Sequence, residues 1–130
     1  MSAITYEELS SKLKEFLVVD VRTRDEVRDS GQIPHSHVLP VQELDEALSL
    51  SPNAFQSKYG FPKLDPNNDE DNNERQLVLT CRSGRRVGIA DNTVKTKGFT
   101  KHRLYLGSFL DWTEKGGPVI KPGQPFQPQQ

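Results

Sequence analysis

Two apolar runs constrain the fold of this sequence more than any other feature. Residues 16–21 (Phe-Leu-Val-Val-Asp-Val) and 76–80 (Gln-Leu-Val-Leu-Thr) are mostly apolar at consecutive positions. Strands with this pattern are typical of a parallel sheet whose two faces are both covered. Because segments with helical spacing lie before, between and after these runs, the pattern predicts one α/β domain, an open, mostly parallel sheet with helices on both faces.

Capping signals and apolar spacing locate the elements around these strands. Residues 5–8 and 23–26 each fit a capping box, in which the first residue caps a helix and a glutamate three positions later bonds back. Ser51 before Pro52 marks another helix start, and Ser108 is predicted to cap a short helix. The remaining predictions are helices at 41–50 and 87–97, strands at 38–39 and 103–106, and core positions at Phe109, Leu110 and Trp112.

Length, charge and cysteine content exclude several classes of protein. The 130 residues suffice for one domain, expected at 1–117 and followed by a Pro/Gln-rich tail at 118–130. With 17 Lys+Arg against 18 Asp+Glu, no basic field for nucleic acid is expected. A single cysteine excludes an internal disulfide and fits a reducing compartment, so a cytoplasmic monomer is expected. No apolar segment resembles a signal peptide or a membrane span, and residues 66–74 predict an acidic surface loop.

The candidate site is the segment Cys81-Arg82-Ser83-Gly84-Arg85-Arg86, which lies between a predicted strand and a predicted helix. Such a turn lies at a helix N-terminus, where free backbone amides and the helix dipole favour negative charge and therefore a cysteine thiolate. Gly84 allows the loop to curl, so that several amides can point at one spot. The three arginines attract anions. The segment predicts a site that holds a reactive sulfur anion, or an anion beside a thiol.

Three motifs resemble the rhodanese (thiosulfate sulfurtransferase) family, and they occur in the family's order. The first is the loop at 81–86. The second consists of Asp20-Val21-Arg22, Glu26 and residues 31–36, and the third spans residues 105–112. Residues 55–60 are most similar to the small single-domain rhodaneses of animals. The sequence departs from the family's pattern at Gln32, at His35-Ser36-His37, at Val87 and at Ser108, which replaces a glycine.

The resemblance implies an enzyme that moves sulfane sulfur from thiosulfate to a thiol or to cyanide through a persulfide on Cys81, with no cofactor. Glutathione or thioredoxin is the implied acceptor in a cell. Cys81 is then the catalytic residue, and the expected substrate-binding residues are Arg82, Ser83, Gly84, Arg85 and Arg86. The expected supporting residues are Asp20, Arg22 and Glu26.

The arginines of the loop are expected to differ in role. Arg82 and Arg85 flank one cysteine, and arginine forks match oxyanions. Arg86 begins the helix, where a cation is unfavourable unless an acid pairs with it, and Asp20 or Glu26 is the expected partner. The three histidines form no convincing metal set, although two of them, His35 and His37, could tune the site; the third is His102.

Two alternative functions stay open at this point. Cysteine phosphatases and arsenate reductases carry an arginine after five intervening residues, a position occupied here by Val87. The shorter loop forms a smaller cradle, which favours sulfur over a tetrahedral oxyanion. A persulfide relay or sensor module would also need Cys81, but it would discharge its sulfur only to a partner protein. Turnover with small acceptors separates an enzyme from a relay.

Overall fold

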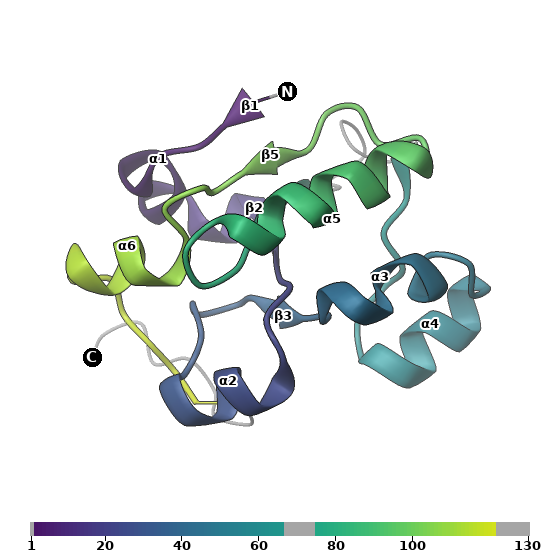
Figure 1. Cartoon of the computed structure of the whole chain (residues 1–130), viewed down its shortest axis with the longest axis horizontal. Coiled ribbons are helices and arrows are strands. Elements are labelled where there is room, and N and C mark those ends of the chain that lie inside the picture. Colours follow the sequence, from purple (N-terminus) through teal and green to yellow (C-terminus); the bar gives the residue numbers. More distant parts are fainter. Residues whose placement is uncertain (1, 67–74, 122–130) are drawn as a thin grey trace.

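Five strands pair into one sheet in which every neighbouring pair is parallel (Figure 1). The structure is a computed structural model that describes residues 2–66 and 75–121. The central strands β2 (Phe16–Asp20) and β4 (Gln76–Thr80) pair along their full length. The order across the sheet is β1-β5-β4-β2-β3, where the outer strands are β1 (Ser2–Ala3), β3 (His37–Val38) and β5 (Arg103–Leu104). The predicted parallel sheet is confirmed.

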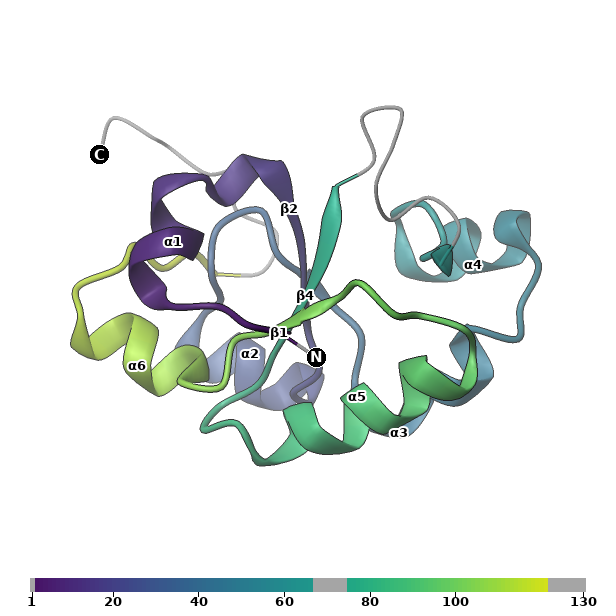
Figure 2. The same ribbon diagram turned by 90° about the horizontal axis from the view of Figure 1, so that it is seen from above.

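Helices cover both faces of this sheet, as predicted. Figure 2 shows α1 and α6 together on one side and α3, α4 and α5 on the other. None of the helices in residues 2–66 and 75–121 is long and apolar enough to cross a membrane. The helices are α1 (Tyr6–Ser11), the short 3₁₀ helix η1 (Leu13–Glu15), α2 (Arg24–Ser30), α3 (Val41–Ala47), α4 (Pro52–Tyr59), α5 (Arg85–Thr96) and α6 (Ser108–Glu114).

Alternating residues of the central strands pack into two separate hydrophobic cores. Val19 and Leu79 belong to the larger core, which α3, α4 and α5 cover. Val18 and Val78 belong to the smaller core around Trp112. Because consecutive residues of a strand point to opposite faces, both faces of β2 and β4 are buried, which explains why their sequences are apolar at consecutive positions.

The predicted helix starts are largely confirmed. The capping box at Thr23 and Glu26 is complete, with side-chain to backbone bonds in both directions. Thr5 Oγ1 accepts a hydrogen bond of 3.1 Å from the Glu8 amide, but the Glu8 carboxylate bonds Arg103 at 2.6 and 2.9 Å instead of reaching back. In the first predicted capping box, the ion pair with Arg103 thus replaces the bond from the Glu8 side chain to the Thr5 backbone. Ser51 caps α4 by accepting a bond from the Ala54 amide.

Two predictions about the last helix are wrong. Ser108 is the first residue of α6 rather than its N-cap, which is Gly107, and no side chain caps this helix. Leu110 was predicted in the core but is 44% exposed, since it lies on the outer side of α6, whereas Phe109 and Trp112 are buried as predicted. The predicted loop at 66–74 and tail at 118–130 lie mostly outside the described residues.

Candidate active site

Cys81 follows the last residue of β4, at the carboxyl edge of the sheet, and the loop after it leads directly into α5. Gly84 occupies the N-cap position of α5 with φ of 102°. Its backbone amide donates a hydrogen bond of 3.1 Å to Cys81 Sγ. A Cβ on this glycine would lie 2.4 Å from the carbonyl oxygen of Leu106, so both the backbone angle and the space require glycine. The loop therefore brings one amide and a helix N-terminus to the sulfur.

Two consecutive carbonyl groups of the loop are hydrogen-bonded to the backbone of α6. The carbonyl oxygen of Cys81 accepts a bond from the Phe109 amide at 3.0 Å, and that of Arg82 accepts from the Leu110 amide at 3.0 Å. Cys81 itself is 1% exposed, whereas Arg82 is exposed. The sulfur therefore lies beneath the surface residues of a loop that cannot move without disturbing α6.

The side chain of Ser108 also contacts Cys81 from outside the loop, and the sequence did not predict this contact. Its hydroxyl accepts a hydrogen bond of 3.1 Å from the Cys81 amide and donates one of 2.8 Å to the Tyr105 carbonyl oxygen. The hydroxyl oxygen of Ser108 lies 3.7 Å from Cys81 Sγ, within reach of an O–H···S contact. The available signal was the replacement of a glycine by serine in the third motif.

Arg86 pairs with Glu26, which confirms the predicted ion pair and selects between its two candidate partners. The guanidinium bonds the carboxylate at 2.5 and 2.9 Å and so joins the start of α5 to the first turn of α2. The hydrogen bond from Arg86 lowers the pKa of Glu26 to about 2. Glu26 in turn raises the pKa of Arg86, whose electrostatic neighbours include Cys81 and Asp20.

Asp20 and Arg22 form a second, fully buried pair beside the site. Arg22 bonds both carboxylate oxygens of Asp20 and the carbonyl oxygen of Gly31, and its guanidinium stacks 4.2 Å above the ring of Phe109. Burial raises the pKa of Asp20, and the hydrogen bonds from Arg22 offset part of this shift. The pair supports the backbone beside the site, because Arg22 also holds the carbonyl oxygen of Gly31. None of these hydrogen bonds involves Cys81.

The side chains of the remaining two arginines of the loop form no ion pair with the described residues. Arg82 and Arg85 are exposed, and neither has an ion-pair partner among residues 2–66 and 75–121. Ser83, expected to bind substrate, is also exposed, and the described contacts include no hydrogen bond between its hydroxyl and Cys81 Sγ. Ser108 instead supplies the hydroxyl beside the sulfur. The exposed arginines are positioned to meet an incoming anion.

The histidines lie away from the sulfur, so the idea that His35 or His37 tunes it gains no support. Burial lowers the pKa of His35, and the charges of Lys14 and Arg75 lower it further. These two cations lie before β2 and β4, at the opposite end of the strands from Cys81, which follows β4. His37 stacks on a phenylalanine ring at 4.1 Å. His102 is buried against Asp91, 2.6 Å away. In the part of the chain that the structure describes, no three metal-ligating side chains gather at one point.

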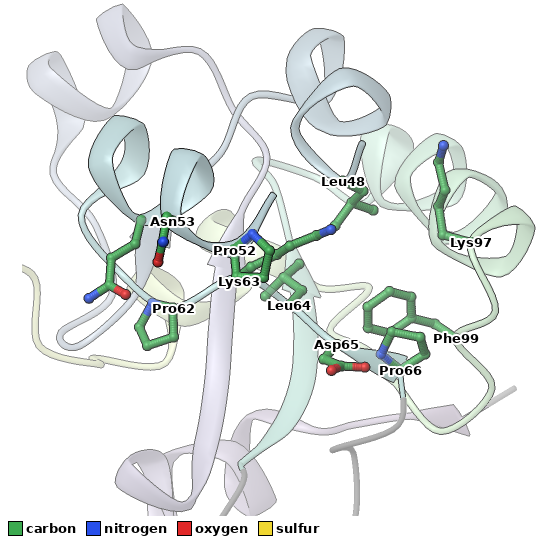
Figure 3. Close-up of a pocket in the computed structure, with 11 residues that line it drawn as sticks. Leu48, Pro52, Asn53, Pro62, Lys63, Leu64, Asp65, Pro66, Lys97 and Phe99 are labelled. Atoms are coloured by element: carbon green, nitrogen blue, oxygen red, sulfur yellow. The ribbon is translucent and has the colours of Figure 1, made fainter. Parts of the chain in front are cut away.

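A pocket of about 410 Å³ lies at the other end of α5 (Figure 3). Figure 3 shows Asp65, Pro66 and Phe99 grouped on one side of it, with Lys97 from the end of α5 nearby. Because α5 has 12 residues, this pocket is separated from the loop of Cys81 by a helix about 18 Å long. It is therefore not part of the candidate active site.

Comparisons with known proteins agree on one family. The family model described as Rhodanese-like domain matches residues 5–115. The Rhodanese domain-containing protein CG4456 of Drosophila melanogaster is 37% identical over 100 residues, which are 77% of this chain and 84% of that protein. The thiosulfate:glutathione sulfurtransferase of Homo sapiens is 37% identical over 98 residues, which are 74% of this chain and 77% of that protein.

A solved structure shows the same architecture. The human single-domain sulfurtransferase TSTD1 has a TM-score of 0.78 and 34% sequence identity to this chain, and the match covers 90% of this chain and 99% of that chain. Both the loop of Cys81 and helix α6 lie inside the segment that the family model matches.

Proposed function

The chain belongs to the rhodanese-like domain family, and from this premise we propose that it is a thiosulfate sulfurtransferase that carries sulfur as a persulfide on Cys81. The observation that carries the proposal is the hydrogen bond of 3.1 Å from the Gly84 amide to Cys81 Sγ at the start of α5. An amide donor and a helix N-terminus stabilise negative charge on sulfur, which is the form that attacks. Relatives named as thiosulfate sulfurtransferases support the same reaction.

In the first step, the Cys81 thiolate attacks the outer sulfur of thiosulfate. The S–S bond of thiosulfate breaks, sulfite leaves with the electron pair, and Cys81 carries the outer sulfur as a persulfide. Because sulfite is a stable anion, no side chain has to protonate the leaving group. Arg82 and Arg85 offset the charge of thiosulfate as it approaches a thiolate.

In the second step, an acceptor attacks the outer sulfur of the persulfide. With a thiolate acceptor and a protonated persulfide, the acceptor leaves as a new persulfide and Cys81 returns to its thiolate form. Cyanide reacts in the same way to give thiocyanate. Sγ of Cys81 therefore gives up its negative charge in the first step and regains it in the second, and this is the atom to which the Gly84 amide donates.

Glutathione is the proposed acceptor, since relatives in Homo sapiens and Saccharomyces cerevisiae are named thiosulfate:glutathione sulfurtransferase. Thioredoxin is a second candidate, because it also supplies a thiolate. We further propose that the monomer is the active unit, because Gly84 and Ser108 supply hydrogen-bond donors to Cys81 Sγ from within the chain. A reducing compartment such as the cytoplasm suits a chain whose single cysteine must remain a thiol.

The ion pair between Arg86 and Glu26 argues against the phosphatase alternative. Its chemistry requires an arginine that closes the loop around a tetrahedral oxyanion, and Arg86 is the one partly buried arginine of the 81–86 loop. That guanidinium already holds Glu26 in two hydrogen bonds. It is therefore committed to a structural pair rather than to a substrate.

Mass spectrometry of the intact protein after treatment with thiosulfate tests the proposal. One extra sulfur atom is expected on the native chain and none on Cys81→Ser, because a hydroxyl is a far poorer nucleophile at neutral pH. Steady-state transfer to cyanide or glutathione then separates enzyme from relay. A persulfide that forms but does not turn over with either small acceptor would support the relay, and labelling of Cys81→Ser would contradict the mechanism.

A further inference from the structure

Ser108 holds a backbone conformation that L-residues other than glycine rarely adopt. Its φ is 58°, and His35 is the only other non-glycine residue with positive φ in the described part of the chain. Ser108 is also fully buried, at 0% exposure. A serine in this conformation is strained, and such strain persists where the surrounding structure holds the residue in place, commonly at functional sites.

The contacts of the side chain indicate what holds it there. A hydroxyl has one proton to donate and two lone pairs to accept with. One lone pair accepts from the Cys81 amide at 3.1 Å, and the proton goes to the Tyr105 carbonyl oxygen at 2.8 Å. Cys81 Sγ lies 3.7 Å from the same oxygen, so a rotation of the O–H bond alone can redirect the proton to sulfur.

We propose that Ser108 is a catalytic residue whose hydroxyl donates a second hydrogen bond to the sulfur of Cys81 whenever that sulfur is negatively charged. The proposal rests on the function proposed above for Cys81. Sγ is charged twice in one cycle: as the thiolate that attacks, and as the leaving thiolate that receives the electron pair when the persulfide bond breaks. The Gly84 amide donates from the loop, and Ser108 donates from α6. No proton is transferred by Ser108.

A purely structural role predicts different behaviour. As an anchor for the Cys81 amide, the hydroxyl would fix the position of the sulfur but leave its charge state unaffected. As a helix cap, it would bond the amides of α6, and it does not. The two remaining roles, donor to the sulfur and anchor for the amide, separate according to how the reactivity of Cys81 depends on pH.

Two variants remove the hydroxyl and differ in backbone strain: Ser108→Ala keeps the strain and Ser108→Gly relieves it. The readout is the rate of alkylation of Cys81 by iodoacetamide, at neutral pH and at a pH where the thiol is fully ionised. Loss of a hydrogen bond to a charged group is expected to slow both variants about tenfold at neutral pH. At high pH both should match the native rate. The hydroxyl control on the same helix is Thr113→Ala, whose side chain bonds the Leu110 carbonyl oxygen.

Steady-state kinetics provide the second readout. Both variants should lower kcat about tenfold with cyanide as acceptor, while KM for thiosulfate stays within about twofold. Equal slowing of alkylation at both pH values, native rates at both, or full activity of Ser108→Gly would overturn the proposal. Should Ser108→Ala fold poorly, Ser108→Gly carries the test. If the native chain forms no persulfide, the proposed function fails, whereas the alkylation comparison still decides whether Ser108 donates to the sulfur.

Discussion

The guanidinium of Arg86 holds the carboxylate of Glu26 through hydrogen bonds of 2.5 and 2.9 Å, although the residues lie 60 positions apart. Both side chains are partly buried, at 25% and 32% exposure. Arg86→Ala should therefore lower the free energy of unfolding by about 1–2 kcal/mol, because Glu26 keeps a partly desolvated charge without its partner. Sulfurtransferase activity should fall as well, since the pair positions the start of α5.

Urea unfolding of each variant measures this difference. The matched control is Arg28→Ala, which breaks an exposed pair with Asp25 and should change stability by less than about 0.5 kcal/mol. Equal stability of the two variants would show that the pair of Arg86 and Glu26 is no stronger than an ordinary surface ion pair.

The same pair predicts a pH dependence of stability. The pKa of Glu26 is lowered from 4.5 to about 2, so the folded state favours the carboxylate. A carboxyl group with a lowered pKa stabilises the fold fully above its unfolded value, and this contribution is lost as pH falls towards the folded value. The stability advantage of the native chain over Glu26→Gln should therefore shrink between about pH 5 and pH 2. An advantage that stays constant over this range would assign the effect to packing instead of charge.

Arg82 and Arg85 should act on the binding of thiosulfate rather than on the fold. Each is exposed and lacks a described ion-pair partner, so replacement by alanine should leave the melting temperature nearly unchanged. KM for thiosulfate should rise, with a loss of about tenfold in kcat/KM for a charge-assisted contact. The loss should weaken at high salt, because exposed charges are screened. Lys58→Ala, an exposed cation on α4, is the control for a general charge effect.

Unchanged thiosulfate kinetics in both arginine variants at low salt would show that the rim of the loop does not bind the donor. An uncharged or protein-bound persulfide would then be the better donor, and the relay function would gain support.

Gly84→Ala should lower the stability of the fold more than Gly60→Ala does. A Cβ at Gly84 would meet a backbone oxygen at 2.4 Å, in addition to the strain of φ at 102°. Gly60 has φ of 81°, but a Cβ there would have nothing within 4 Å, so Gly60→Ala measures backbone strain alone, about 1–2 kcal/mol. Gly84→Ala should exceed that cost and abolish persulfide formation. Comparable melting temperatures for the two variants would mean that the loop shifts away from Leu106 easily.

Features set by local chemistry could be predicted from the sequence. The bounds of β4 follow from an apolar run that is buried on both faces. Val87, Ala90 and Val94, whose spacing puts them on one side of α5, are all buried. The strand–loop–helix order likewise placed Cys81 at the carboxyl edge of the sheet. These features depend on neighbours in the sequence.

Features set by contacts between distant segments could not be predicted. The choice between Asp20 and Glu26 as the partner of Arg86 depends on how α2 packs beside α5. The contact of Ser108 with Cys81 joins residues 27 positions apart, and the short strand β1 exists because β5 lies beside it. The surroundings of His35 follow from the path of the chain into β3, which sequence spacing does not reveal.

The chain beyond α6 has a consequence for where the protein can be cut or fused. Ile120 exchanges two backbone hydrogen bonds with Gln32, at 2.7 and 3.0 Å, and Trp112 Nε1 donates to the Pro118 carbonyl oxygen at 2.7 Å. Gln32 follows Gly31, whose carbonyl oxygen holds Arg22. A partner protein or affinity tag joined directly after Gly117, in place of residues 118–121, would remove these hydrogen bonds to Gln32 and Trp112. Attachment after Lys121 keeps these hydrogen bonds, so that position is the safer choice for immobilising or labelling the protein.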